Sequence, residues 1–357
     1  MDLQVINLAQ AGKWLEILKM CYRYDFYHCP SYHEISTNNR SYESCLFTYQ
    51  EGVYTIAIPL IIRPINEIEG LESLNQNDAT SVYGYAGPVA SHDTIPNRII
   101  ETFQGNLKKY FHDNDIVCTF SRLHPLISQQ PFLKGFGDVA RKGQTISIDL
   151  RLPVDEQYSR YRTDHKRNIS RLRRLGAHCI NDKLAEHLED FIAIYHENMK
   201  RVGAQEKYFF DKAYFQQLLS AKDFDMHLFT CFLEDDMACG GLFSLCNGIV
   251  QYHLGATRSE YLKLAPMKLL IDEVRIWTKE VGAFCFHLGG GYGADEDSLF
   301  NFKAGFSDTI HDFNVWQLVV MKKKYTEICR QRALWTEQRS REPISGNYFP
   351  VYRCPTP

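Results

Sequence analysis

The stretch His287–Phe306, HLGGGYGADEDSLFNFKAGF, joins a short apolar strand to a triple-glycine turn, an acidic loop and a lysine flanked by aromatic residues. Gly289, Gly290 and the glycine after them permit positive φ, and without a Cβ they let backbone N–H groups come close to a ligand. Lys303 follows Phe302, so we expect a partly desolvated ammonium that donates to developing negative charge or serves as a tuned acid. The alternative is a surface turn followed by the start of an amphipathic helix with a snorkelling lysine.

Length and composition bound the class of protein. A chain of 357 residues is long for a single core, so two globular domains are expected. The net charge of −3 excludes a wholesale nucleic-acid coat but leaves room for a local basic patch. The eleven cysteines show no CxxC pair and are interpreted as reduced core thiols. No apolar run reaches the roughly 18 residues needed to span a bilayer, and a cytoplasmic location is expected.

The periodic segments predict an α/β fold in two parts. Helical and strand-like segments alternate in the first part, and the alternating strand 144–150 opens the second. The second part then has two helices, three antiparallel strands, a helix and a strand, which is the order expected of an acyltransferase-type α/β fold. We predict domains at 1–143 and 144–314, a helix at 315–335 that packs back on the first domain, and an extended tail at 336–357.

A basic helix is expected at residues 161–176, YRTDHKRNISRLRRLG. The segment contains six arginines and lysines, Arg167 among them, and a single acid, Asp164. This density indicates a phosphate-binding surface, and the phosphates of a nucleotide sugar, of coenzyme A or of a tRNA backbone would all satisfy it. A solvated helix face remains the alternative.

Several common sites are excluded because their motifs are missing. The chain has no HExxH, no Cys/His zinc pattern, no GxSxG elbow and no GxxxxGK loop. The sequence GGGYG lacks the GxGxxG register of a dinucleotide site. The acids at 295–297 are interpreted as a solvated loop, so no metal and no bound cofactor are expected. The remaining chemistry is group transfer, in which Lys303 and backbone N–H groups are expected to donate hydrogen bonds to an oxyanion.

Six segments in order carry a family resemblance. They are DFYHCPSY at 25–32, YGYAGP at 83–88, HKRNI at 165–169, NMKR at 198–201 followed by YFF at 208–210, QYHLGA at 251–256, and the HLGGG…SLFNFK ending. With these segments the chain resembles the FemAB/FemX-type aminoacyl transferases and their relatives in the GNAT acyltransferase superfamily.

The resemblance implies a layered α/β fold of two GNAT-like domains packed around a cleft. In that family an amino acid moves from aminoacyl-tRNA to the amine of a peptidoglycan precursor, so amide-bond formation on a nucleotide- or lipid-linked cell-envelope precursor is implied. Lys303 matches the family lysine that is thought to stabilise the acyl-transfer transition state. Arg201 matches an arginine that grips the precursor's phosphates, and Tyr252 with His253 lies where aromatic residues line that site. Around them we expect Arg167, Phe302, Gly289 and Gly290 to bind substrate.

The chain also departs from the family. A lysine of the substrate loop is replaced near Ser36, and no long heptad-patterned arm for tRNA is present. The segment Leu264–Lys268 lacks the glycines of a coenzyme A turn, although Pro266 begins a helix whose N–H groups could meet a phosphate. Two alternatives stay open: an acyl-CoA-dependent N-acyltransferase acting on an amino sugar in polysaccharide biosynthesis, and a non-catalytic module that binds tRNA or an anionic glycan.

Overall fold

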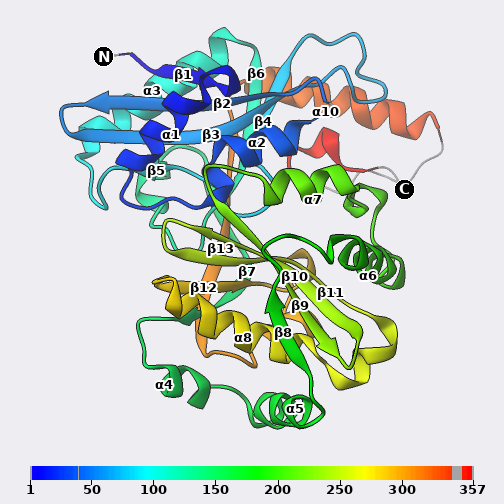
Figure 1. The fold of residues 1–357 in the computed structure, drawn as a ribbon. Coiled ribbons are helices and arrows are strands. Elements are labelled where there is room, and N and C mark those ends of the chain that lie inside the picture. Colours follow the sequence, from blue (N-terminus) through cyan, green and yellow to red (C-terminus); the bar gives the residue numbers. More distant parts are fainter. Residues whose placement is uncertain (1, 39, 340–347, 356–357) are drawn as a thin grey trace. The chain divides into compact units, whose positions relative to one another are not determined.

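The protein divides into two compact units (Figure 1). The structure is a computed structural model that describes residues 2–38, 40–339 and 348–355. Unit 1 consists of Met1–Lys142 and Phe313–Pro357, and unit 2 of Gly143–Asp312. The chain passes between the units within two strands, β7 (Asp138–Asp149) and β13 (Thr309–Val319).

Unit 1 is built on a sheet in the order β1-β2-β3-β4-β6-β13. The β2–β3 pair is a hairpin with a two-residue loop, where Gly52 has a φ of 62°. Helix α3 buries apolar side chains at helical spacing from Ile99 to Phe111, and this stripe packs on the sheet. The strands are β1 (Gln4–Asn7), β2 (Glu43–Glu51), β3 (Tyr54–Pro64), β4 (Asn77–Thr80), β5 (Val89–Ala90, paired with β3) and β6 (Ile116–Arg122); the helices are α1 (Ala11–Met20), α2 (Pro30–Thr37), α3 (Asn97–Asp113) and α10 (Lys322–Glu337).

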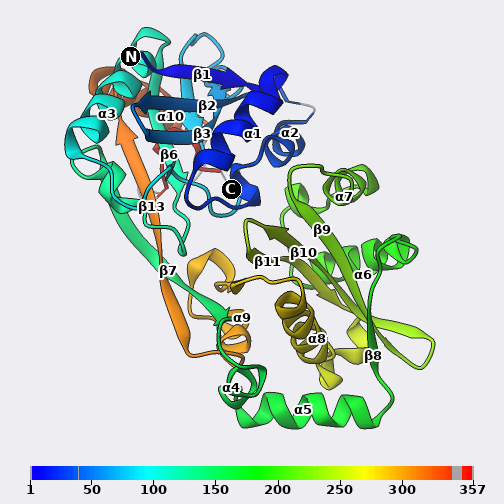
Figure 2. The same ribbon diagram turned by 60° about the vertical axis from the view of Figure 1, so that its left-hand side comes forward.

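Unit 2 is built on a sheet in the order β7-β12-β11-β10-β9-β8. Helices α6 and α8 cover opposite faces of this sheet, as Figure 2 shows. The aromatic ring of Phe191 on α6 lies against Gly240, whereas the neighbouring Cys239 faces the core under α5 and α8. The strands are β8 (His178–Asn181), β9 (Asp225–Leu233), β10 (Asp236–Cys246), β11 (Ile249–Thr257) and β12 (Cys285–Gly289); the helices are α4 (Val154–Ser159), α5 (Thr163–Arg174), α6 (Leu188–Arg201), α7 (Lys212–Leu219), α8 (Met267–Glu280) and α9 (Ser298–Lys303).

The two units share one plan. Unit 1 runs β1, α1, α2, β2, β3, β4, α3, β6, and unit 2 runs β8, α6, α7, β9, β10, β11, α8, β12. In each, three antiparallel strands are followed by a helix and a parallel strand, β6 beside β4 and β12 beside β11. An antiparallel strand then completes each sheet, β13 on β6 and β7 on β12. The predicted layered α/β fold with two similar halves is confirmed.

The prediction for the carboxyl-terminal region was wrong in two places. Residues 315–335 were expected to form one helix, but β13 ends at Val319 and α10 begins at Lys322. Val315 and Trp316 are buried in a strand because they pair with β6. The tail was expected to be extended, but α10 continues to Glu337 and residues 348–355 pack on unit 1. Residues 340–347 and 356–357 lie outside the described part.

A buried carboxylate holds the end of the chain. Asp78 on β4 and Tyr352 are both fully buried, and the Tyr352 hydroxyl donates to Asp78 Oδ2 over 3.0 Å. Arg353 Nε donates to the same oxygen, and Arg63 Nε donates to Oδ1 over 2.8 Å. Two guanidinium groups therefore compensate one buried charge, which is the condition for a buried carboxylate to be tolerated.

Asp78→Ala should destabilise unit 1 strongly. The substitution leaves Arg63 and Arg353 without their buried counter-charge, and breaking such a pair costs about 3 kcal/mol or more. We expect a large drop in the urea midpoint of unfolding monitored by circular dichroism. Asp113→Ala is the control, because its pair with Lys109 lies on the surface and should contribute little. Equal midpoints for the two variants would show that Asp78 does not hold the chain end.

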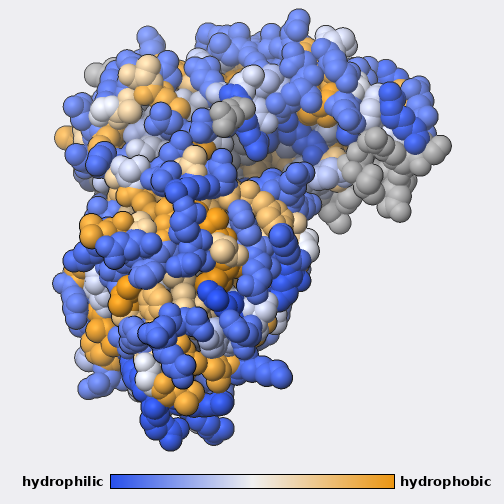
Figure 3. All heavy atoms as spheres, turned by 45° about the vertical axis from the view of Figure 1, so that its right-hand side comes forward, coloured by the Kyte–Doolittle hydropathy of each residue, from blue (hydrophilic) through white to orange (hydrophobic). Residues whose placement is uncertain are grey.

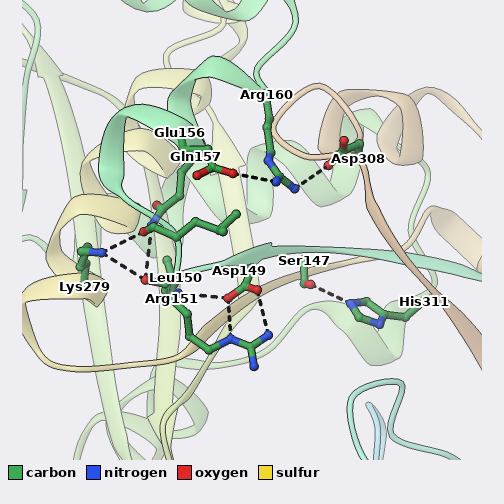
Figure 4. A network of polar contacts seen from close by, with 11 residues as sticks. Ser147, Asp149, Leu150, Arg151, Glu156, Gln157, Arg160, Lys279, Asp308 and His311 are labelled. Atoms are coloured by element: carbon green, nitrogen blue, oxygen red, sulfur yellow. Dashed lines mark hydrogen bonds and ion pairs between the residues drawn. The ribbon is translucent and has the colours of Figure 1, made fainter.

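Side chains also fix the carboxyl end of β7 in unit 2 (Figure 4). Lys279 of α8 donates to the backbone oxygens of Leu150 and Leu152 over 3.3 and 2.9 Å, and Gln157 of α4 donates to Leu152 O over 2.8 Å. Farther back on β7, Ser147 Oγ lies 2.7 Å from His311 Nε2. Lys279 is therefore a lysine with a structural role, bound to main-chain carbonyls.

The surface of unit 2 carries scattered hydrophobic residues. Hydrophobic atoms gather in patches in the lower half of Figure 3. The exposed apolar side chains include Leu175, Val202 and Val281, which directly follow or lie close after α5, α6 and α8. Single apolar residues at helix ends are ordinary and do not define one docking face. None of the described helices is long and apolar enough to cross a membrane.

Candidate active site

The parallel strands of unit 2 separate at their carboxyl ends. Strands β11 and β12 pair only through residues 249–251 and 285–287. Beyond that point β11 continues to Thr257, while Gly289 at the end of β12 is paired with Ile146 of β7. Ligands of open α/β sheets bind outside the carboxyl ends of parallel strands. The place where β11 and β12 part is therefore the candidate site.

Helix α9 brings Lys303 to this place. The Asp297 carboxylate caps the helix by accepting from Phe300 N over 2.8 Å, and it also accepts from Tyr292 N over 3.0 Å. Lys303, the last residue of α9, donates from Nζ to Gly290 O over 2.7 Å. Its Nζ also lies 5.6 Å from the centroid of the Tyr252 ring on β11. The ammonium thus contacts β11 and the turn that follows β12.

The environment of Lys303 suits a donor to negative charge. The residue is only 8% exposed, and desolvation lowers its pKa from 10.5 to about 8, against the opposing effect of Asp297. The charged form therefore predominates at pH 7. An ammonium has three N–H donors, and Gly290 O takes one of them. In the described part of the chain, two donors remain for a ligand oxygen, which is the requirement for stabilising an oxyanion.

The glycine turn is required by the protein's own packing. Gly289 has a φ of 79°, a conformation that other residues rarely adopt. A Cβ on Gly290 would lie 2.6 Å from Gln144 O, and one on Gly291 would lie 2.0 Å from Asp295 O. The sequence interpretation assigned these glycines to ligand contact, and the structure adds that close backbone approach within unit 2 already demands them.

Tyr252 and His253 point in different directions. The Tyr252 ring stacks on Phe243 with centroids 5.3 Å apart, and burial raises the pKa of its hydroxyl. His253 Nε2 instead lies 3.2 Å from the hydroxyl of Tyr214 on α7. A bulge that shifts the β10–β11 register falls beside these residues. Tyr252 contacts Lys303 whereas His253 contacts Tyr214, and their shared role as one aromatic wall stays a prediction.

The two arginines assigned to phosphate binding do not join Lys303. Arg201 donates to Thr257 O over 3.2 Å and to Ser259 Oγ over 2.9 Å, and it also contacts Asn198. Of these partners, Thr257 lies about 17 Å along β11 from Tyr252, at roughly 3.3 Å per residue. Arg167 lies on the exposed face of α5 and makes no hydrogen bond or ion pair within the described residues. Both assignments stay predictions.

A histidine that sequence reasoning missed braces helix α9. His165 on α5 is 3% exposed, and its Nε2 lies 2.9 Å from the backbone oxygen of Phe302, directly before Lys303. Its Nδ1 lies 3.0 Å from Asp164, which is paired with Lys268 at 2.8 Å. The spacing of His165 with the buried Ile169 and Leu172 was the available signal, because it places His165 on the buried face of α5.

The chain is similar to known proteins at two levels. Residues 159–303 match the family model described as an acetyltransferase (GNAT) domain, and no curated protein sequence matches. Among solved structures, FemX has a TM-score of 0.70 and 12% identity, with 92% of this chain and 100% of that chain covered. L-PGS from Bacillus licheniformis has a TM-score of 0.52 and 13% identity, with 90% and 96% covered. The carboxyl-terminal domain of a putative lysylphosphatidylglycerol synthetase from Agrobacterium fabrum has a TM-score of 0.55 and 10% identity, with 89% and 97% covered.

The chain contains an acetyltransferase (GNAT) domain at residues 159–303, which supports transferase activity. Its resemblance to the FemAB/FemX-type proteins, predicted from the sequence, is confirmed at the level of the fold, because the likeness to FemX extends over both units. The alternative of a non-catalytic binding module is thereby set aside.

Gly290→Ala should destabilise the protein and displace the carbonyl that Lys303 binds. The added methyl group must move away from Gln144 O, and such overpacking costs about 2 kcal/mol. The control is Gly105→Ala in the exposed part of α3, where nothing lies within 4 Å of the added Cβ. That variant should instead gain about 0.5 kcal/mol or more. Thermal unfolding of both variants checks the opposite signs, and a neutral Gly290→Ala would contradict the described turn.

Lys303 should make stability rise with pH. Its pKa is lowered from 10.5 to about 8 by desolvation in the folded protein. Between these values the unfolded chain holds a proton that the folded chain has lost, so the free energy of unfolding increases with pH. The full shift corresponds to about 3 kcal/mol. Urea unfolding of wild type and Lys303→Met at several pH values isolates this residue, and a difference that stays flat above pH 8 would contradict it.

Proposed function

We propose that the protein forms an amide bond on an amine of a cell-envelope precursor, with aminoacyl-tRNA as the donor and a peptidoglycan-type precursor as the acceptor. The observation that carries the proposal is the buried ammonium of Lys303 at the parted ends of β11 and β12. The likeness to FemX over the whole chain supports it. A cytoplasmic location, where charged tRNA is made, is part of the proposal.

The reaction needs positioning and charge stabilisation. The acceptor amine, once deprotonated, attacks the ester carbonyl of the donor and forms a C–N bond. The carbonyl oxygen becomes an oxyanion, to which the free N–H donors of Lys303 can hydrogen-bond, and such a donor contributes about 100-fold or more in rate. Collapse of the intermediate breaks the C–O bond of the ester. The amine nitrogen loses one proton, and the oxygen of the leaving group takes up one proton to become a hydroxyl.

The amino end of α8 supports tRNA over acyl-CoA as the donor. A diphosphate at this end would bind the N–H groups of the first turn. Here the amides of Lys268, Leu269 and Leu270 already donate to the carbonyls of Ala265 and Pro266. An acyl-CoA-dependent N-acyltransferase acting on an amino sugar remains the second candidate, because the matched domain is described as an acetyltransferase.

The exposed arginines of α5 are proposed to hold donor phosphates. Arg167, Arg171 and Arg174 recur at helical spacing on the exposed side of α5. Arg173, in contrast, is paired with Asp272 and Glu273 of α8 at 2.9 and 2.6 Å. The three exposed guanidinium groups have no ion-pair partner among the described residues, although Arg174 Nε donates to Ser170 O over 3.4 Å, and such a row suits the repeated charges of a nucleic-acid backbone. Arg201 is proposed to meet the precursor's phosphates.

A mass-spectrometric transfer assay tests the proposal. Purified protein receives charged tRNAs or acyl-CoAs in parallel, each with a pool of cell-envelope precursors, and products are identified by mass. We expect an amide product in the tRNA arm. Lys303→Ala should lose about 100-fold or more in turnover, because it removes the oxyanion donor. The matched control is Lys279→Ala, which removes another lysine bound to backbone carbonyls and should keep its turnover.

The outcomes separate the hypotheses. Product in the CoA arm alone would contradict the proposed aminoacyl transfer and support acyl-CoA-dependent N-acylation. Near-normal turnover of a folded Lys303→Ala would remove Lys303 from the chemistry. Equal losses in Lys303→Ala and Lys279→Ala would indicate a general loss of structure in unit 2.

A further inference from the structure

Three cysteines lie side by side across unit 2. Cys179 on β8 is the register partner of Cys231 on β9, and Cys231 is also the partner of Cys239 on β10. Directly opposed residues of antiparallel strands point to the same face. Cys231 and Cys239 belong to the core under α5 and α8, and Cys179 packs against that core. The three thiols therefore form a row on one face of the sheet.

The first two sulfur atoms meet the conditions for a disulfide. Opposed residues in antiparallel strands have Cα atoms about 4.5 to 5.5 Å apart, which falls within the range of disulfides, roughly 4.4 to 6.8 Å. The thiols of Cys179 and Cys231 also interact electrostatically, and so do the thiols of Cys231 and Cys239. The strand register therefore places the backbones of Cys179 and Cys231 within disulfide reach.

The members of the row differ in access and in acidity. Cys231 and Cys239 are fully buried, whereas Cys179 is half-buried on β8, the last strand of the sheet. A solute can therefore reach Cys179 first. The interaction of the two thiols raises the pKa of Cys179, whereas interactions with Cys179 and then Cys239 lower the pKa of Cys231. The row thus has an accessible sulfur and, behind it, a sulfur suited to attack.

We propose that Cys179 and Cys231 form a site of reversible oxidation that a peroxide converts to a disulfide. The Cys179 sulfur breaks the O–O bond of the peroxide, forms an S–OH group and releases water when the oxidant is hydrogen peroxide. The Cys231 sulfur then attacks Cys179 Sγ, and the displaced hydroxyl takes the Cys231 proton and leaves as a second water. Two thiols lose two electrons and two protons, and one peroxide becomes two waters.

The disulfide would join β8 to β9 at the edge of the sheet. Strand β8 has only four residues and pairs with β9 alone. A covalent bond to β9 removes the freedom of this edge strand to detach, and a thiol reductant restores it. This inference is independent of the acyl donor and acceptor.

Peptide mapping of the full-length protein tests the site. The protein is exposed to hydrogen peroxide, free thiols are alkylated, and digests are compared with and without reduction. Trypsin places Cys179 in the peptide 175–183, and cleavage at Asp235–Asp236 separates Cys231 from Cys239. We expect the 179–231 linked peptide to exceed any other linked pair at least ~10-fold, and dithiothreitol to remove it.

Three variants make the test specific. Cys179→Ser should abolish the linked peptide, and Cys231→Ser should leave a sulfenic acid at Cys179 that dimedone traps. Cys354→Ser is the control, because its thiol contacts only the backbone oxygen of Pro355 among the described residues, and it should change nothing. Oxidation of Cys179 in the wild type without linkage to Cys231, or linkage that forms only in urea, would overturn the proposal. The wild-type map decides even where a serine variant fails to fold.

Discussion

The buried ammonium of Lys303 is the constraint around which the site is organised. A charge that is removed from water needs polar partners, and the structure supplies the carbonyl of Gly290 and the face of the Tyr252 ring. The carbonyl is in place because glycines allow the chain to pass close to β7. The lysine is in place because Asp297 caps α9 and His165 holds the backbone before it. Turn, loop and helix therefore depend on one another within about twenty residues.

Because the two units share one plan, the strand end next to Lys303 in unit 2 can be compared with its counterpart in unit 1. Both units have a parallel strand pair formed across a helix, so the fold alone offers a strand end in each. In unit 2 the strand end leads to the glycine turn and α9. In unit 1, β6 leads to His124, whose Nε2 lies 3.0 Å from Asp25 in a fully buried pair. The corresponding strand end thus leads to an ammonium in unit 2 and to a buried imidazole–carboxylate pair in unit 1.

Much of the fold followed from hydrophobic periodicity, because that pattern records which face of an element is buried. The helices at α1, α3 and α8 and the strands from β9 to β12 were predictable in this way. Strand β13 was not, because its strand character comes from pairing with β6, some 190 residues earlier in the chain. The buried tail around Tyr352 was missed for the same reason, since its partner Asp78 is distant in sequence. The two units share order and pairing but no residue pattern that a sequence repeat would show.

At the site, the sequence predicted those features that neighbouring residues in the chain determine. Lys303 among aromatic residues is desolvated, as expected. The separation of Tyr252 from His253 depends on strand geometry and on the bulge beside them, which no local pattern records. The acidic run at 295–297 was interpreted as a solvated loop, yet Asp297 binds two backbone amides. Capping of a short helix could be recognised only once α9 itself was recognised.

Arg201 and Arg167, the two candidates for phosphate binding, differ in the contacts that each would lose on binding an anion, and this difference indicates which would bind first. Arg201 would have to exchange its hydrogen bonds to Thr257 and Ser259 for an anion, so its binding energy is reduced by the cost of those contacts. Arg167 has no such contacts to lose within the described residues and needs only partial desolvation. An anionic ligand therefore gains more at once on α5, where the row of arginines also strengthens long-range attraction. Under the proposed function, helix α5 would therefore make the first encounter, and Arg201 would engage an anion only when the end of β11 rearranges.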